Sequence, residues 1–138
     1  MEEYVSKTVS INRAAEQIYT ALADMSFLEK AIASAPIDEL QDLKATSDTC
    51  SFKMKGIETG LQIVEREPYK TIKYTKYGNS PFDFFLWIQL KEIAPYETCM
   101  RIVLKVELNM LMKLMVGGKI KKGLDAAADR LAQAINLA

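Results

Sequence analysis

Two stretches in the second half of the chain alternate apolar and polar residues. The apolar positions of the first are Phe82, Phe84, Leu86, Ile88 and Leu90, and those of the second are Met100, Ile102, Leu104, Val106 and Leu108. A period of two is typical of strands with one buried face. The turn residues Ala94, Pro95 and Tyr96 separate the stretches, so we expect an antiparallel pair.

Weaker patterns of the same kind predict further strands earlier in the chain. They cover residues 4–11, 40–44, 50–55, 61–64 and 71–77. Glycine and proline mark the connections: Gly56 and Gly60 bracket an expected bend, and turns are expected at 67–70 and 78–81. Together the patterns predict an antiparallel sheet of about six or seven strands.

Helical spacing of apolar residues predicts two short helices after the first strand. The apolar stripe of the first helix consists of Ala15, Ile18, Tyr19 and Leu22. Asn12 is its expected N-cap, because the side-chain oxygen can accept a free amide hydrogen of the first turn. Ser26 and Glu29 have the spacing of a capping box for the second helix, which we expect to reach about Ala33 and to end before Pro36.

Residues 110–138 predict one long amphipathic helix, which has to cover a face of the sheet by itself. Its first turns are rich in leucine and in methionine, whose flexible thioether adapts to its surroundings. Gly117 and Gly118 interrupt the pattern, and each costs roughly 1 kcal/mol relative to alanine inside a helix. The pair indicates a kink, close backbone packing, a helix that starts after residue 116, or a gate at a cavity mouth.

Several features of this order of elements have counterparts in one known superfamily. Residues 9–19 (VSINRAAEQIY) are similar to its first strand and helix entry, and residues 61–72, with Pro68 at the turn, to its central hairpin. The strands at 82–90 and 100–108 then lead into the closing helix. The chain therefore resembles the START-like or SRPBCC superfamily, which includes the birch-pollen allergen and polyketide-cyclase relatives.

The resemblance implies an α+β helix-grip fold over residues 1–138 as a single START-like domain. In this fold a curved antiparallel sheet, here of about six or seven strands, wraps around one long C-terminal helix, with two short helices after the first strand. It also implies an apolar cavity between sheet and helix that binds lipids, sterols, polyketides or plant hormones.

Mapped onto this chain, the cavity takes its lining from the apolar parity of the strands and from the long helix. The strand positions are Phe52, Met54, Leu61, Ile63, Ile72, Tyr74, Phe84, Leu86, Ile88, Ile102 and Leu104. The helix positions are Leu111, Leu114, Met115 and Leu124. We therefore expect non-catalytic binding of a small hydrophobic or amphipathic ligand, lipid-like or polyketide-like. If these residues instead fill a solid core, the chain is a protein-interaction adaptor.

Both faces of the strand at 84–88 are apolar, which departs from the simple alternation. Phe85 and Trp87 are expected to point away from the helix, and Val103 shares this outer parity. An exposed aromatic patch often marks an interface, so this face is a candidate homodimer or partner contact. The alternatives are a bulge that reverses the parity locally and an end segment that covers the patch.

Charge and hydropathy exclude other partners. The 138 residues carry 18 lysines and arginines against 18 aspartates and glutamates, so no overall charge attracts nucleic acid or an anionic membrane. No apolar run reaches the roughly 18 residues that span a bilayer. The acidic residues 2–3 do not fit a secretion signal. We expect a cytoplasmic protein with no nucleic-acid partner and no stable membrane insertion.

The chain has no histidine, which removes the usual triads of hydrolases and the imidazole sites of zinc and haem. It also lacks the glycine-rich loops that bind nucleotides. We therefore expect no catalytic residue, no metal and no cofactor. Cys50 and Cys99 lie in predicted strands and are expected to be free structural thiols.

A cyclase or dehydratase that uses polar groups inside the cavity is the less favoured alternative. Tyr74 supplies an inward hydroxyl, whereas Lys53, Arg66 and Asp83 are expected to face outward. The long helix also carries a basic cluster, which consists of Lys113, Lys119, Lys121 and Lys122. Such a cluster is most simply a solvated helix face, and it otherwise suits an anionic ligand head group or an anionic membrane surface.

Overall fold

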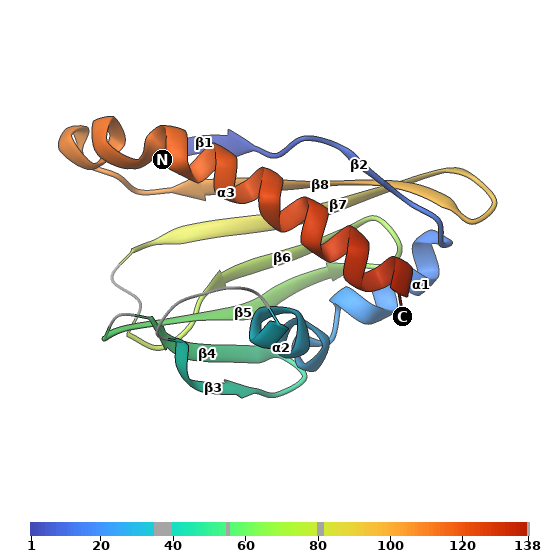
Figure 1. Cartoon of the computed structure of the whole chain (residues 1–138), viewed down its shortest axis with the longest axis horizontal. Helices are drawn as coiled ribbons and strands as arrows, with labels where there is room; N and C mark the ends of the chain where they lie inside the picture. The colour runs from blue at the N-terminus through green and yellow to red at the C-terminus, as the bar shows by residue number, and fades with distance from the viewer. Residues whose placement is uncertain (35–39, 55, 80–81, 138) are drawn as a thin grey trace.

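A long helix lies diagonally across one face of an antiparallel sheet (Figure 1). The computed structural model describes residues 1–34, 40–54, 56–79 and 82–137. The elements are β1 (Glu2–Val5), β2 (Val9–Ile11), α1 (Ala15–Leu22), α2 (Met25–Ser34), β3 (Leu40–Ala45), β4 (Thr49–Met54), β5 (Ile57–Glu67), β6 (Thr71–Lys76), β7 (Phe84–Ala94), β8 (Glu97–Val106) and α3 (Met110–Leu137). The predicted helix-grip fold is thereby confirmed.

The strands form one sheet in the order β1-β8-β7-β6-β5-β4-β3, and β2 also pairs with β8. The predicted first strand is thus two strands on the same edge. Ser6 lies between them: its amide donates to the carbonyl of Ile102 at 2.8 Å, and its hydroxyl accepts the amide of Ile102 at 2.8 Å. These two bonds keep the chain on the edge of β8 where the regular ladder is interrupted.

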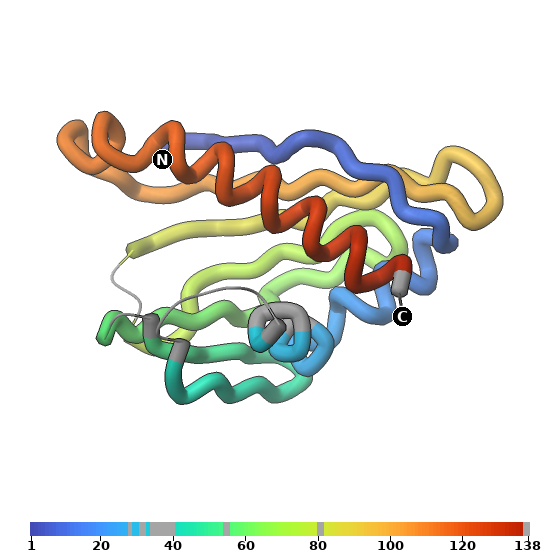
Figure 2. Tube along the Cα trace, in the orientation of Figure 1, coloured from blue at the N-terminus to red at the C-terminus, as the bar shows by residue number. Residues whose placement is uncertain are grey.

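Antiparallel pairing places successive connections at opposite ends of the sheet. The turns after β3, β5 and β7 lie at one end, close to α1 and the end of α3, and we call this the core end. The other end, which we call the rim end, holds the N-terminus, the β4–β5 and β6–β7 connections and the start of α3. The tube in Figure 2 shows the N-terminus beside the first turns of α3. An ion pair between Glu2 and Lys113, with oxygen and nitrogen 3.2 Å apart, joins them.

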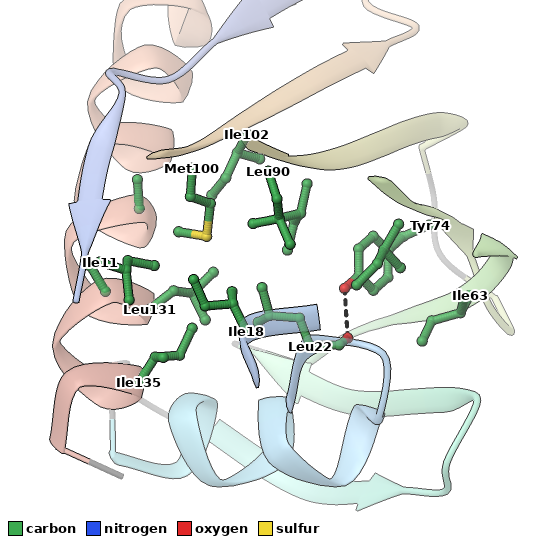
Figure 3. Packing of buried hydrophobic residues seen from close by; sticks show 14 of the residues in the cluster. Ile11, Ile18, Leu22, Ile63, Tyr74, Leu90, Met100, Ile102, Leu131 and Ile135 are labelled. Carbon is green, nitrogen blue, oxygen red and sulfur yellow. Dashed lines mark hydrogen bonds between the residues drawn. The ribbon is translucent and has the colours of Figure 1, made fainter. Parts of the chain in front are cut away.

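The packed core lies between the second half of α3, helices α1 and α2, and the inner face of the sheet (Figure 3). The residues that α3 contributes are Leu124, Ala128, Leu131, Ala132 and Ile135, each at most 9% exposed. Helix α1 contributes Ile18 and Leu22, which are 0% exposed. The i, i+4, i+7 spacing along α3 puts its buried residues on one face, as an amphipathic helix requires.

Helix α3 continues without a break through the glycine pair, as the prediction of one long helix from residue 110 requires, so the alternative of a start after residue 116 is wrong. A Cβ atom on Gly117 would lie 3.3 Å from the hydroxyl oxygen of Tyr4, whereas one on Gly118 would meet nothing within 4 Å. Close packing against β1 therefore accounts for Gly117. The tight approach fixes the first half of α3 at the edge of the sheet.

The first short helix does not begin as expected. Its N-cap is Ala14, whose amide donates to the side-chain oxygen of Gln17 at 3.1 Å. Asn12 is therefore not the N-cap. Its backbone amide instead donates to the side-chain oxygen of Asn136 at 3.1 Å. This bond ties the entry of α1 to the end of α3, which sequence spacing alone does not reveal.

The second short helix begins at Met25, so Ser26 and Glu29 lie inside it and do not form the expected capping box. The side chain of Asp24 takes the capping role and accepts the amide of Ser26 at 2.9 Å. An aspartate before the first turn satisfies an amide that has no partner within the helix. Pro36, the predicted terminator, lies outside the described residues.

The expected bend between Gly56 and Gly60 occurs at Gly56 alone, which has a positive φ of 77°. Gly60 lies inside β5 and pairs with Ser51 of β4. Its carbonyl accepts the amide of Tyr77 at 3.1 Å. The absence of a side chain at Gly60 lets backbone from both neighbouring strands approach closely.

We expect Gly60→Ala to lower the free energy of unfolding by about 1–3 kcal/mol. The new Cβ atom would lie 2.7 Å from the Tyr77 carbonyl oxygen and 3.0 Å from the Cys50 carbonyl oxygen. Gly118→Ala is the matched control, and it should raise stability by about 0.5–1 kcal/mol because it adds a better helix former in open space. Urea denaturation measures both changes. Wild-type stability of Gly60→Ala would contradict the close approach around Gly60.

Candidate functional site

The structure divides the predicted cavity lining into groups with different exposure. The first group is buried in the packed core and consists of Ile63, Ile72, Tyr74, Ile88, Ile102 and Leu124, none more than 8% exposed. These side chains contact one another and the helices at the core end (Figure 3). They belong to a packed core, and a packed core is the alternative to a cavity lining that the sequence leaves open for these residues.

The second group is half-buried and apolar, and we call it the inner strip. It consists of Phe52, Leu61, Phe84, Leu86 and Leu104. Leu86 of β7 pairs directly with Leu104 of β8, so their side chains lie next to each other on the inner face. All members except Phe84 pack against the core. The strip therefore extends the core surface toward the rim end without being sealed.

The third group lies on the first turns of α3 and is exposed. Leu111 is 66% exposed, Leu114 84% and Met115 65%, so the expectation that they face the sheet is wrong. The physical reason is helical geometry. The buried stripe continues back from Leu124 in steps of four to Ile120, which is half-buried.

The residues that the sequence analysis missed on α3 are those of this same stripe. Val116 and Met112 follow Ile120 at four-residue steps toward the N-terminus of the helix, and both are half-buried. Apart from Lys113, residues 110–116 are all apolar, so hydrophobicity alone does not select the inward face. Counting back from Leu124 would have found it. The side chain of Met54, the remaining predicted position, lies outside the described residues.

The rim end carries many large apolar side chains that are exposed to solvent. This apolar rim consists of Ile57, Tyr77, Phe82, Met110, Leu111, Leu114 and Met115, which are 38–84% exposed. They come from the start of β5, from the β6–β7 connection and from the start of α3, which antiparallel pairing brings to one end (Figure 1). A concentration of exposed apolar residues at one end of a protein marks a binding surface.

The hydroxyl of Tyr74 is engaged inside the core. It donates to the carbonyl oxygen of Leu22 at 2.9 Å, and the residue is 1% exposed (Figure 3). Burial raises the pKa of this phenol well above its usual range. Tyr74 therefore holds α1 on the sheet and does not present its hydroxyl to the inner strip.

The polar residues considered with Tyr74 are dispersed. A register shift in β5 brings Arg66 to the helix side, contrary to the outward expectation, where it donates to the Ala23 carbonyl at 3.0 Å and pairs with Asp48 at 2.6 Å. The remaining two are in separate surface pairs, Lys53 with Asp42 at 3.8 Å and Asp83 with Lys76 at 2.6 Å. Within the described ranges, no group of three or more cysteines, aspartates and glutamates is placed to hold a metal ion.

The basic cluster of α3 is partly paired. Lys113 pairs with Glu2, and Lys121 with Asp125 at 2.9 Å. The hydrogen bond from Lys121, followed by one from the Lys7 backbone amide, holds the pKa of the Asp125 carboxyl below its usual value. Lys119 and Lys122 are exposed. No helix among the described residues is both long and apolar enough to cross a membrane.

On the outer face of the sheet, the rings of Phe85 and Trp87 lie 6.1 Å apart between centroids. The Lys73 ammonium lies 4.7 Å from the Phe85 centroid, and the Lys105 ammonium 5.6 Å from the Trp87 centroid, as in cation–π contacts. Val103 is only 7% exposed, so the expectation that it adds to an exposed patch is wrong. The register of β7 and β8 is unbroken here, and the parity is not reversed. A homodimer through this face stays a prediction.

A shallow hollow of about 390 Å³ lies beside Thr8, between residues 89–91 of β7 and 99–101 of β8. It is remote from the inner strip and contains the half-buried Cys99. Cys50 is fully buried, and no disulfide joins the two cysteines. Burial, with a smaller contribution from the negative charge of Glu29, raises the pKa of the Cys50 thiol to about 11.

We expect the native protein to expose only the Cys99 thiol to a chromogenic disulfide reagent at about pH 8, because a thiol reacts as its thiolate. Cys50 remains protonated there, since its pKa lies near 11, and it is also inaccessible. Denaturant should release the second thiol. Cys99→Ser should abolish the fast reaction and Cys50→Ser should preserve it; rapid reaction of both thiols in the folded protein would contradict this placement.

Comparison with known proteins addresses the fold. Neither a scan of protein-family models nor a search of curated proteins finds a match. Solved structures do match. A START superfamily protein from Mycobacterium smegmatis has 16% identity and a TM-score of 0.65, over 97% of this chain and 94% of that one. The Aha1 dimer from Colwellia psychrerythraea has 19% identity and a TM-score of 0.65, over 99% and 98%.

A third structure adds a complex with small molecules. Norcoclaurine synthase from Thalictrum flavum, in complex with dopamine and hydroxybenzaldehyde, has 11% identity and a TM-score of 0.73, over 97% of this chain and 86% of that one. At these identities the similarity concerns the fold. The chain therefore has the helix-grip fold of START-like proteins.

Proposed function

We propose that the protein binds a small hydrophobic or amphipathic molecule against the inner strip, beneath the first half of α3, without transforming it chemically. The observation that carries this proposal is the uneven burial of the apolar residues on the inner face of the sheet. At the core end the face is sealed by α1, α2 and the second half of α3. Toward the rim end the same face is only half-buried.

The inner strip has the properties of a ligand wall. Leu86 and Leu104 are neighbours across β7 and β8, and Phe84 continues the same parity toward the rim. Val116 and Ile120 on α3 are half-buried on the stripe that faces the sheet. Small-molecule sites are mostly apolar, so this composition suits a ligand with a large hydrophobic part.

The position of α3 also supports the proposal. The first half of the helix approaches the β1 edge closely at Gly117 and Tyr4, and the Lys113–Glu2 pair joins its start to β1. The inner strip also includes residues of β4, β5 and β7, strands that lie beyond β8 when counted from that edge. An elongated apolar molecule placed on the strip would remain in contact with both sheet and helix.

A binding role is favoured over an enzymatic one by the polar side chains. The Tyr74 hydroxyl is bonded to Leu22, and Arg66 is bonded at the core end. Neither reaches the inner strip as a free acid or base. The norcoclaurine synthase structure, with dopamine and hydroxybenzaldehyde, is a protein of this fold in complex with small molecules. That precedent supports a ligand here as an inference from fold alone.

The alternative is a protein-interaction adaptor, and the sealed core end is the observation that favours it. An adaptor would use the exposed apolar rim to contact another protein and would leave the inner strip empty of ligand. Binding of an apolar probe separates the two, because an adaptor with a solid interior offers the probe no internal site.

We expect Leu86→Trp to weaken the binding of anilinonaphthalene sulfonate by about tenfold or more, which corresponds to about 1.4 kcal/mol. The indole ring would occupy space on the inner strip that the probe uses. Fluorescence titration measures the affinity, and urea denaturation measures the stability of the variant. Because the position is half-buried, the fold should tolerate the larger ring.

Met115→Trp is the matched control, since Met115 is 65% exposed and has no internal space to fill. It should leave probe affinity close to that of the wild type. Loss of about 1–3 kcal/mol of stability in Leu86→Trp, together with no probe binding by the wild type, would show a solid interior and favour the adaptor.

A further inference from the structure

We propose that the first turns of α3 dock on an anionic lipid surface and bring the rim end of the protein to the membrane. The docking surface consists of Met110, Leu111, Leu114 and Met115 together with Lys119 and Lys122. This inference goes beyond the proposed function, because it concerns where the protein sits and not what it holds. It is tested with protein that carries no added ligand.

The apolar part of the docking surface is unusually exposed. Met110 is 83% exposed and Leu114 84%, while Leu111 and Met115 are each about two thirds exposed at 66% and 65%. All four lie within the first two turns of one helix, off the stripe that continues to Leu124. Large apolar side chains gathered this closely on a water-facing helix mark a surface that is covered by something else.

The charges of the same helix identify what covers it. Between residues 110 and 124 the helix has four lysines and no acidic residue, although the chain as a whole has a net charge of zero. Lys113 is paired with Glu2 and Lys121 with Asp125, and Lys119 and Lys122 are exposed. Exposed apolar side chains beside lysines are the combination that lies in a membrane interface.

A lipid surface fits this charge better than a second copy of the chain. Two copies joined through the same surface would bring like-charged lysines together, which opposes association. An anionic bilayer attracts each lysine near its surface and also accepts the apolar side chains at the boundary of its acyl region. The helix would lie on the membrane and not cross it, in agreement with its length and polarity.

Docking in this way has a structural consequence for the rest of the rim. Ile57 at the start of β5, and Tyr77 and Phe82 on the β6–β7 connection, lie at the same end of the sheet as the start of α3 (Figure 1). A protein held by α3 therefore turns these side chains toward the lipid as well. The inner strip also extends toward this end of the sheet.

Sedimentation with vesicles tests the docking. The protein should bind vesicles made of phosphatidylcholine and phosphatidylglycerol, and bind vesicles of phosphatidylcholine alone at least about tenfold more weakly. Added salt should weaken the binding, because it screens exposed charges. No binding to the anionic vesicles, or equal binding to both kinds, would overturn the proposal.

Variants separate the apolar and the charged contributions. Leu111→Glu with Leu114→Glu should abolish vesicle binding, and Lys119→Glu with Lys122→Glu should reduce it by about tenfold or more. Ile93→Glu is the matched control, because Ile93 is 53% exposed but lies near the core end of β7, and it should bind as the wild type does. Circular dichroism shows whether each variant is folded. Wild-type binding by a folded Leu111→Glu, Leu114→Glu protein would overturn the assignment.

A second copy of the chain on this surface would give a different result. If the surface joins two copies of the chain, sedimentation should give the mass of a dimer that Leu114→Glu dissociates, with no vesicle binding; this result would overturn the proposal. The vesicle measurement is independent of the probe titration with Leu86→Trp. If the protein binds the probe but not the vesicles, the proposed function stands and the docking is overturned. If it binds the vesicles but not the probe, the docking stands and the proposed function is overturned.

Discussion

The packing of α3 on the sheet over only part of its length is the constraint on which the rest of the structure depends. A helix of 28 residues is about 42 Å long. The buried side chains from Leu124 to Ile135 span only about 17 Å of it. Lys7 helps to hold this packed half, because its amide donates to Asp125 at 2.6 Å and its ammonium pairs with Asp129 at 2.5 Å. The first half of α3 is left on the β1 edge, supported by a few contacts.

This partial packing of α3 explains why the apolar inner face of the sheet is closed at the core end and only half-buried at the rim end. At the core end, α1 and α2 insert Ile18, Leu22 and Met25 between α3 and the sheet, and the interior is closed. At the rim end no described helix other than α3 covers the inner face, and the strip around Leu86 and Leu104 stays half-buried. Hydrophobic burial thus provides stability at the core end, and the apolar surface at the rim end is available for binding. The proposed ligand and the proposed membrane contact both follow from this gradient.

Much of the fold was predictable because period-two and helical patterns report local geometry directly. The strands at β7 and β8, the turn at Pro95 and the long C-terminal helix all follow from those patterns. The predictions were wrong where contacts between residues far apart in the sequence determine the local structure. Asn12 bonds to α3 and does not cap α1. Gly60 does not form a bend, and its missing side chain leaves room for the carbonyls of Cys50 and Tyr77. In the site, the strand parity placed the inner strip on the correct face. The first turns of α3 are apolar at every position except Lys113, so only the spacing from Leu124 shows which side faces the sheet.

The central claim is that an apolar ligand contacts the inner strip at the rim end while the core end stays closed. Methyl NMR spectra recorded during titration with anilinonaphthalene sulfonate test it most directly. The account predicts shifts at the methyl groups of Leu86, Leu104 and Ile120, with those of Ile18 and Leu131 unchanged. Shifts confined to Ile18 and Leu131, or no shifts at any of these methyl groups, would contradict it.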